Sequence, residues 1–139
     1  MKNLISISIF AIALIISSCH KQSNSNINQT NNTLIQQGDW KITSYIDKGN
    51  DETNHYTNFV FRFGANGTVT AIKTSSTITG TWLTGIDDNQ EKLVLYFTTS
   101  PFDELNADWH IISQSATQIK LEDVSGGGGG TAYLTFEKI

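Results

Sequence analysis

The residue with the clearest chemical potential in this sequence is Cys19, the only cysteine among 139 residues. A thiol is a nucleophile, and outside the reducing cytosol a lone thiol is exposed to oxidation unless its sulfur is blocked. Cys19 ends an apolar stretch, Leu4 to Ile16, which follows Lys2 and gives way to polar sequence. A positive residue, a short apolar core and small residues before a boundary are typical of a secretory signal peptide. The segment therefore predicts export, with Cys19 at the point of processing.

The four residues Ile16-Ser17-Ser18-Cys19 resemble a bacterial lipobox, whose cysteine is lipidated and becomes the mature N-terminus. The resemblance implies that residues 1–18 are a lipoprotein signal peptide and that several acyl chains on Cys19 anchor the protein stably to a membrane. The expected location is the bacterial cell envelope, at the outer membrane, with either of its faces open. Two alternatives remain: cleavage by an ordinary signal peptidase, and a retained transmembrane helix, for which the stretch falls short of roughly 20 residues.

The other polar residues of the sequence form no recognisable catalytic set. No Gly-x-Ser-x-Gly nucleophile elbow is present. His55 and His110 lack a third His or Cys at metal-ligand spacing, and the acidic pairs 87–88 and 103–104 lack the spaced repeat of a calcium-binding loop. The glycine run 126–130 precedes a predicted strand, not the Lys-Ser or Lys-Thr and helix of a phosphate loop. The sequence predicts a non-enzyme without metal or other cofactor.

Composition divides the exported chain into two parts. Residues 20–33 are almost all polar, with Ile27 as the one apolar side chain, and cannot bury enough surface to offset the entropy of ordering. We expect residues 19–33 to form a flexible tether and residues 34–139 to form one domain. The net charge of −4 is spread along the chain without a basic block, so nucleic acid is not an expected partner.

Alternation of apolar and polar residues predicts that this domain is all-β. Trp40 to Ile46 and Phe59 to Phe63 show the period of two that half-buried strands require. Asn66-Gly67 supplies the positive backbone angles of a tight hairpin. The eight predicted strands cover residues 40–46, 59–63, 68–72, 77–83, 91–98, 107–113, 117–123 and 131–138.

The links between these strands are short, which indicates antiparallel neighbours. The segment from Pro101 to Leu105 is long enough for a single helical turn, with proline at its first position. Eight sequential antiparallel strands close into an up-and-down barrel or pack as a β-sandwich. Closure leaves no exposed sheet edge, so the barrel is the favoured prediction and the sandwich the alternative.

Several motifs are similar to those of lipocalins. Gly38-Asp39-Trp40 matches the Gly-x-Trp that opens the first lipocalin strand, Leu34-Ile35 fits the short turn that closes the barrel floor, and Lys138 is the basic residue expected near that tryptophan. The whole domain resembles the small lipocalin-like lipoproteins of Bacteroidetes. Further motifs that carry the resemblance are Phe59 to Phe63, Asn66-Gly67, Gly80-Thr81-Trp82, Trp109-His110-Ile111 and Leu134 to Lys138. It implies a lipocalin-like barrel and a small apolar ligand.

The inner face decides whether such a ligand has room. If Trp40 points inward, alternation places many large side chains inside, and an eight-stranded barrel is just wide enough to be filled or to hold one small ligand. Ala71 and Gly80 are the small inward positions, so any cavity is expected near them. The candidate ligand-binding residues are Trp40, Phe61, Ala71, Gly80, Trp82 and Trp109.

The outer face offers a second function. Alternation places Tyr45, Tyr96 and Tyr133 outside, together with several aliphatic residues. A contiguous patch of these side chains would dock an envelope protein or a glycan. Two functions therefore stay open: a lipid-anchored protein that binds a small apolar ligand, and an envelope interaction module with a fully packed barrel.

Overall fold

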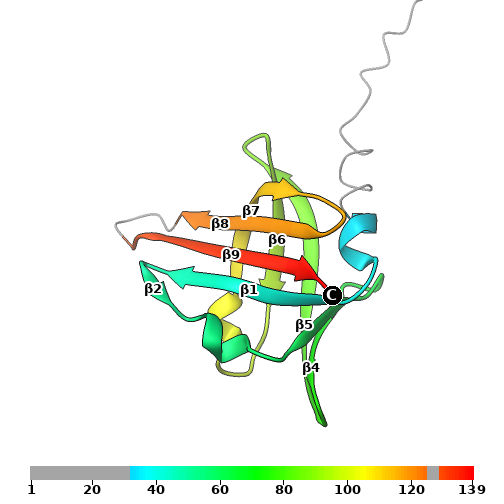
Figure 1. Ribbon diagram of the computed structural model, residues 1–139. Coiled ribbons are helices and arrows are strands. Elements are labelled where there is room, and N and C mark those ends of the chain that lie inside the picture. The colour runs from blue at the N-terminus through cyan, green and yellow to red at the C-terminus, as the bar shows by residue number, and fades with distance from the viewer. Residues whose placement is uncertain (1–31, 125–128) are drawn as a thin grey trace, which may run out of the picture.

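The computed structural model describes residues 32–124 and 129–139. The predictions for the signal peptide (residues 1–18), for Cys19 and for residues 20–31 of the tether therefore lie outside the described residues. The chain forms a closed antiparallel barrel of eight strands with one short additional strand, which confirms the predicted fold class (Figure 1). The strands are β1 (Trp40–Asp47), β2 (Asn50–Asp51), β3 (Val60–Phe63), β4 (Thr68–Lys73), β5 (Ser76–Asp87), β6 (Gln90–Tyr96), β7 (Ala107–Gln114), β8 (Gln118–Val124) and β9 (Thr131–Lys138).

The sheet follows the order of the sequence and closes through β1. Neighbouring strands pair in succession from β3 to β9, and β1 then pairs with β9. The β1–β9 ladder runs from Trp40 opposite Lys138 to Asp47 opposite Ala132. On its other edge, β1 pairs with β3 at Trp40 and Phe61, and with β2 at its far end. The barrel is thus closed by a long ladder on one side of β1 and by a short contact on the other.

The hairpins form where the sequence supplies residues that accept positive φ angles. Gly67 has φ of 78° between β3 and β4, and the Asn66 side chain accepts a hydrogen bond from the Thr68 N–H at 3.1 Å. Asp88 and Asn89 have φ of 45° and 65° between β5 and β6. Asn and Asp tolerate this region better than other non-glycine residues. The Asn66-Gly67 hairpin was predicted, and the structure confirms it.

Both ends of the barrel are covered by short helical segments (Figure 1). At one end, residues 32–36 form a helical turn whose Ile35 is buried, as the Leu34-Ile35 motif predicted. At the other end lie two 3-10 turns, η1 (Thr53–Tyr56) and η2 (Phe102–Leu105). The Tyr56 hydroxyl donates to the Pro101 carbonyl at 2.9 Å, which joins η1 to the start of η2. The predicted single turn after Pro101 is η2.

One prediction about the faces of β1 is wrong. Alternation placed Tyr45 outside, but its side chain is buried, with 3% of its surface exposed. The register of β1 against β9 shifts between Ile42 and Ser44, and an extra residue in a strand reverses the alternation that follows it. Tyr45 therefore points inward, where its hydroxyl donates to the Glu104 carbonyl at 2.8 Å.

Candidate functional site

The six predicted ligand-binding residues all lie in one packed core, spread from one end of the barrel to the other rather than gathered at a single site. Their surfaces are at most 7% exposed where they are hydrophobic, and Gly80 is buried as well. Aromatic rings fill the space between them: Phe61 and Phe136 meet edge to face at 5.4 Å, and Phe63 meets Trp82 at 5.5 Å. The members of this cluster are Trp40, Phe61, Ala71, Gly80, Trp82 and Trp109.

Gly80 and Ala71, where a cavity was expected, face other residues at close range. A Cβ atom added to Gly80 would lie 2.5 Å from both Phe97 Cδ1 and the Tyr96 carbonyl oxygen. The Phe97 ring therefore occupies the space that the missing side chain leaves. Ala71 is fully buried opposite Phe61 in the β3–β4 ladder. Neither small residue leaves room for a ligand, because neighbouring side chains and backbone already fill the site.

The three tryptophans each tie a connecting segment to the barrel wall. The indole N–H of Trp40 donates to the Ile35 carbonyl at 2.8 Å, which holds the helical turn 32–36 across one end. Trp109 donates to the Leu105 carbonyl at 2.8 Å and so holds η2 at the opposite end. Trp82 donates to the Gly64 carbonyl at 2.9 Å beside the β3–β4 hairpin. Buried indoles normally find such partners, and these bonds give the tryptophans a structural role.

A groove on the side of the barrel is a candidate binding site. It has a volume of about 450 Å³ and lies between β1 and the segment that leads from η1 into β3. The residues that line it are Lys41, Ile42, Thr43, Thr53, Tyr56, Thr57, Asn58, Phe59, Val60 and Ile139. We call this opening the seam groove. Sequence reasoning missed it, because the alternation in both strands predicts regular pairing.

The seam groove exists because the contact between β1 and β3 stops after one residue pair. That pair joins Trp40 and Phe61. Just before β3, Asn58 has a φ of 69°, which turns the backbone away from an extended path alongside β1. The next part of the β1 edge that has a partner is Tyr45, whose N–H donates to Thr53 Oγ1 and whose carbonyl accepts from the Glu52 N–H, both at 2.9 Å. Residues 41–44 of β1 lie between these two contacts.

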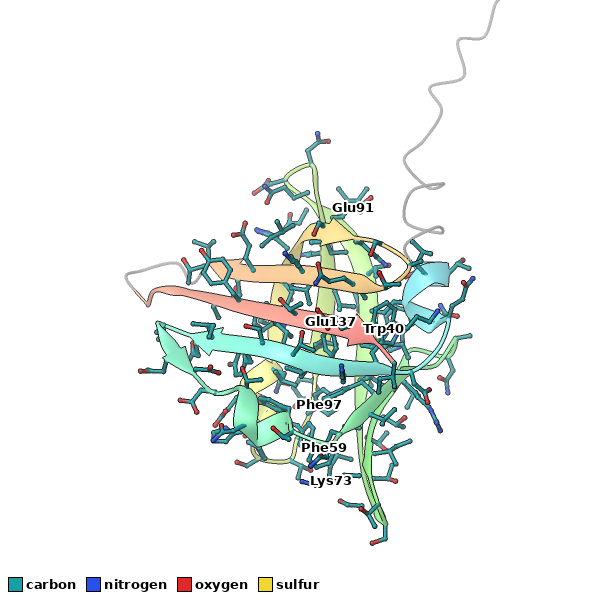
Figure 2. All side chains as sticks on the ribbon, viewed as in Figure 1. Trp40, Phe59, Lys73, Glu91, Phe97 and Glu137 are labelled. Carbon is teal, nitrogen blue, oxygen red and sulfur yellow. The ribbon has the colours of Figure 1, made fainter. Side chains whose placement is uncertain are left out.

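Positive charge borders the seam groove. Lys41 is an exposed lining residue on β1. Lys73, at the end of β4, donates to the Thr57 carbonyl at 3.2 Å, and its ammonium lies 5.2 Å from the centre of the Phe59 ring. Figure 2 labels both Phe59 and Lys73 below β1. No aspartate or glutamate side chain is among the lining residues, although the whole chain carries a net charge of −4.

A smaller and more acidic pocket lies at the barrel end near η2. It has a volume of about 220 Å³, and its lining includes Asp47, Glu104 and Asp123 beside Lys48. Burial, reinforced by the charges of Asp47 and Glu104, raises the pKa of Tyr45 to about 12. Within residues 32–124 and 129–139, no group of three or more His, Cys, Asp or Glu side chains is placed to hold a metal ion. The raised pKa is consistent with the Tyr45 hydroxyl acting as a hydrogen-bond donor to the Glu104 carbonyl.

The outer tyrosines do not form the single patch that was considered. Tyr45 is buried, while Tyr96 and Tyr133 are both exposed. Tyr96 lies on β6 and Tyr133 on β9, and β7 and β8 separate these strands in the sheet. A smaller apolar group does occur where exposed Leu83 on β5 stands opposite Val94, two residues from Tyr96.

The geometry defines the protein as a small closed β-barrel with a filled interior and an open groove in its wall. No protein-family profile and no curated protein sequence matches the chain. Among solved structures, the fold is similar to that of a DUF4847 family protein from Bacteroides vulgatus ATCC 8482, with a TM-score of 0.50 and 18% sequence identity. The match covers 77% of this chain and 96% of that protein. At this identity the likeness concerns the fold alone. In the described part of the chain, no helix has the length and apolar character to cross a membrane.

Proposed function

We propose that the protein is a lipid-anchored component of the bacterial cell envelope, and that its barrel is an interaction module whose binding site is the seam groove. The observation that carries the proposal is the contrast between the interior, where Phe97 fills the space beside Gly80, and the barrel wall, where the groove of about 450 Å³ is open. Binding sites are usually concave and mostly preformed. In this barrel the concave site lies outside the core.

The interior part of this proposal is tested by native mass spectrometry of the full chain, purified in mild detergent from its own host. The expected mass is that of the lipidated chain alone, because side chains occupy the barrel. Long-chain fatty acids added to the protein should not quench its tryptophan fluorescence, since all three indoles are hydrogen-bonded within the fold. A co-purified apolar molecule that quenches this fluorescence would instead support a barrel that binds a small apolar ligand in its interior.

A small apolar ligand in the seam groove is a second candidate. Ile42, Phe59 and Val60 supply apolar surface there, and the groove volume falls within the roughly 300–1,000 Å³ of small-molecule sites. Val60→Asp would place a charge in the groove, whereas Val94→Asp places the same charge on the distant β6 strand. A co-purified molecule that is lost from the first variant and kept by the second would support this candidate over a macromolecular partner.

The anchor is tested separately at Cys19. Cells grown with an alkyne fatty acid are expected to label the wild-type protein, and Cys19→Ala should abolish labelling because the sulfur that carries the lipid is gone. Ser25→Ala, in the predicted tether, is the matched control and should label normally. Labelling that persists in Cys19→Ala, or an unmodified Cys19 in the mature protein, would contradict the proposed anchor.

A further inference from the structure

We propose that the seam groove binds an extended polypeptide segment that carries acidic side chains, and that this segment pairs with residues 41–44 of β1 as an additional strand. The inference rests on the proposed function and names the partner class of the same groove. It depends on three features: an open strand edge, an apolar floor and a positively charged border.

The open edge follows from the register of β1. Along residues 41–44 the β9 edge of β1 is paired, with Lys41 opposite Glu137 and Ile42 opposite Phe136. On the other edge, the pairing of β1 with β3 within the described residues consists of Trp40 and Phe61. An unpaired strand edge is a template for another strand, because it presents a row of N–H and C=O groups. At about 3.3 Å per residue, these four residues offer roughly 13 Å of edge.

The protein's own chain approaches this edge without pairing to it. Asn58 has a positive φ, and the Phe59 N–H donates back to the Tyr56 carbonyl at 3.2 Å, which forms a turn rather than a strand. The Thr57 carbonyl is already taken by the Lys73 ammonium. The segment opposite β1 is therefore held in a curved path, and this leaves the groove between the two.

The floor of the groove suits one face of an extended peptide. Ile42 and Val60 supply aliphatic surface, and the hydroxyls of Thr43 and Thr53 border it. Successive side chains of a strand point to opposite faces, so alternate residues of a bound peptide would meet this floor and the others would face solvent. A glycan is less well matched, because the Phe59 ring that could stack on a sugar is contacted by Phe102, at 4.9 Å, and by Lys73.

The lysines beside the seam groove favour a negatively charged partner. Lys41 lines the groove, and Lys73 lies beside it, in contact with the lining residues Thr57 and Phe59. Neither lysine forms an ion pair with a described residue. No Asp or Glu side chain is among the lining residues, although Glu137 stands opposite Lys41 in the β1–β9 ladder. Complementary charge raises association rates and disfavours wrong partners. Acidic residues on the solvent side of the bound strand would complete this complementarity.

The test uses a phage-displayed library of random decapeptides, selected against the full chain immobilised in mild detergent. Selected peptides should alternate apolar residues with others and be enriched in Asp and Glu. Methylation of alternate backbone nitrogens should weaken binding of a selected peptide at least tenfold, because it removes the donors that pair with β1 and leaves the side chains unchanged. Lys41→Glu should also weaken binding at least tenfold. Lys120→Glu, the same charge reversal at an exposed position of β8, should leave it unchanged.

Hydrogen exchange supplies a structural readout of the same complex. Amide exchange across residues 41–44 should slow when a selected peptide is bound, while the β5–β6 hairpin should be unaffected. Failure to select any peptide, insensitivity to N-methylation, or self-association of the chain through the groove would each overturn the proposal. If no peptide is selected, while Cys19 is labelled and no ligand co-purifies in the barrel, the proposed function survives without this partner class.

Discussion

The two edges of β1 are closed in different ways. Toward β9, the ladder has seven register pairs from Trp40 to Asp47 and tolerates a shift beside Ile42. On the opposite edge, one register pair with β3 is followed by a gap over residues 41–44. Beyond the gap, the Thr53 hydroxyl accepts from the Tyr45 N–H, and the Glu52 N–H and β2 supply backbone partners. The same strand thus has one edge satisfied by backbone pairing and one edge satisfied in part by side chains from η1.

This difference explains how a barrel can be both filled and open. Ladder hydrogen bonds need an extended partner at strand spacing, whereas aromatic packing needs only that the rings meet. Tyr56, Phe59 and Phe61 all contact Phe102 from the β3 side of the barrel, with ring centres 4.9–6.1 Å apart. Packing holds β3 to the core, and the backbone between β3 and β1 stays apart as the seam groove.

The largest expected effect comes from comparing phenylalanines on the two sides of β1. Phe136 on β9 is fully buried, and Phe136→Ala should lower the free energy of unfolding by about 3–5 kcal/mol, because it leaves a cavity in the core. Phe59 at the seam groove is only partly buried, so Phe59→Ala should cost about 1–2 kcal/mol. Urea unfolding followed by tryptophan fluorescence measures both. Equal losses of unfolding free energy in the two variants would mean that the side chains at the seam groove are as tightly packed as those of the β1–β9 side.

A smaller effect is expected from the hydroxyl that substitutes for a strand partner. Thr53→Val keeps the shape of the side chain but removes the acceptor for the Tyr45 N–H, which should cost about 1–2 kcal/mol. The Tyr45 amide should also exchange faster with solvent. Thr135→Val on β9 is the matched control and should change neither quantity appreciably. Unchanged Tyr45 exchange in Thr53→Val would show that water or another group satisfies this edge.

The smallest effect on stability is expected from the ion pair between Asp39 and Arg62, which lies at the end of the seam groove where β1 and β3 pair. Asp39, just before β1, accepts two hydrogen bonds from Arg62 on β3, at 2.6 and 2.8 Å, and these lower the pKa of its carboxyl from 3.8. A lowered folded-state pKa stabilises the fold above the unfolded value, and this stabilisation is lost as the pH falls through the folded value. Asp39→Asn should therefore flatten the loss of stability below about pH 4.

Acid titration of unfolding, at low and high salt, measures this effect at Asp39. Both groups are largely exposed, so the difference between wild type and variant at neutral pH should be small and should shrink with salt. Asp103→Asn is a suitable control, because Asp103 lies on η2, away from this pair. If stability falls with pH in the same way for the wild type and Asp39→Asn, the ion pair contributes nothing to the contact between β1 and β3.

Most of the fold was predictable because its signals are local. Period-two alternation identified the eight long strands, and their order followed from short links that allow only antiparallel neighbours. Positive-φ residues such as Gly67 marked the hairpins. The bulge in β1 was not predictable, because an extra residue at Thr43 changes the face of Tyr45 without leaving a distinct residue pattern.

The candidate site was less accessible to sequence reasoning. The six predicted residues are inward, but whether inward means a pocket or a packed core depends on how far rings from other strands reach. Beside Gly80 the Phe97 ring fills the space, so this part of the interior is packed core. The presence of a glycine at position 80 does not predict which ring lies against it. The seam groove depends on the local turn at Asn58, closed by the hydrogen bond from the Phe59 N–H to the Tyr56 carbonyl, and on the position of η1. Contacts with residues far along the chain, such as the Tyr56 hydrogen bond to Pro101, hold η1 in place.

Neighbouring residues were enough to predict an antiparallel all-β domain with aromatic residues on its inner face, because alternation and turn residues are local signals. The resemblance of residues 16–19 to a lipobox is also local, and the export and anchoring of the chain through Cys19 stay predictions. The filled interior and the groove in the barrel wall became apparent from the three-dimensional packing. Those outcomes depend on distances between side chains far apart in the chain, where a single ring or a single residue pair separates a pocket from a core.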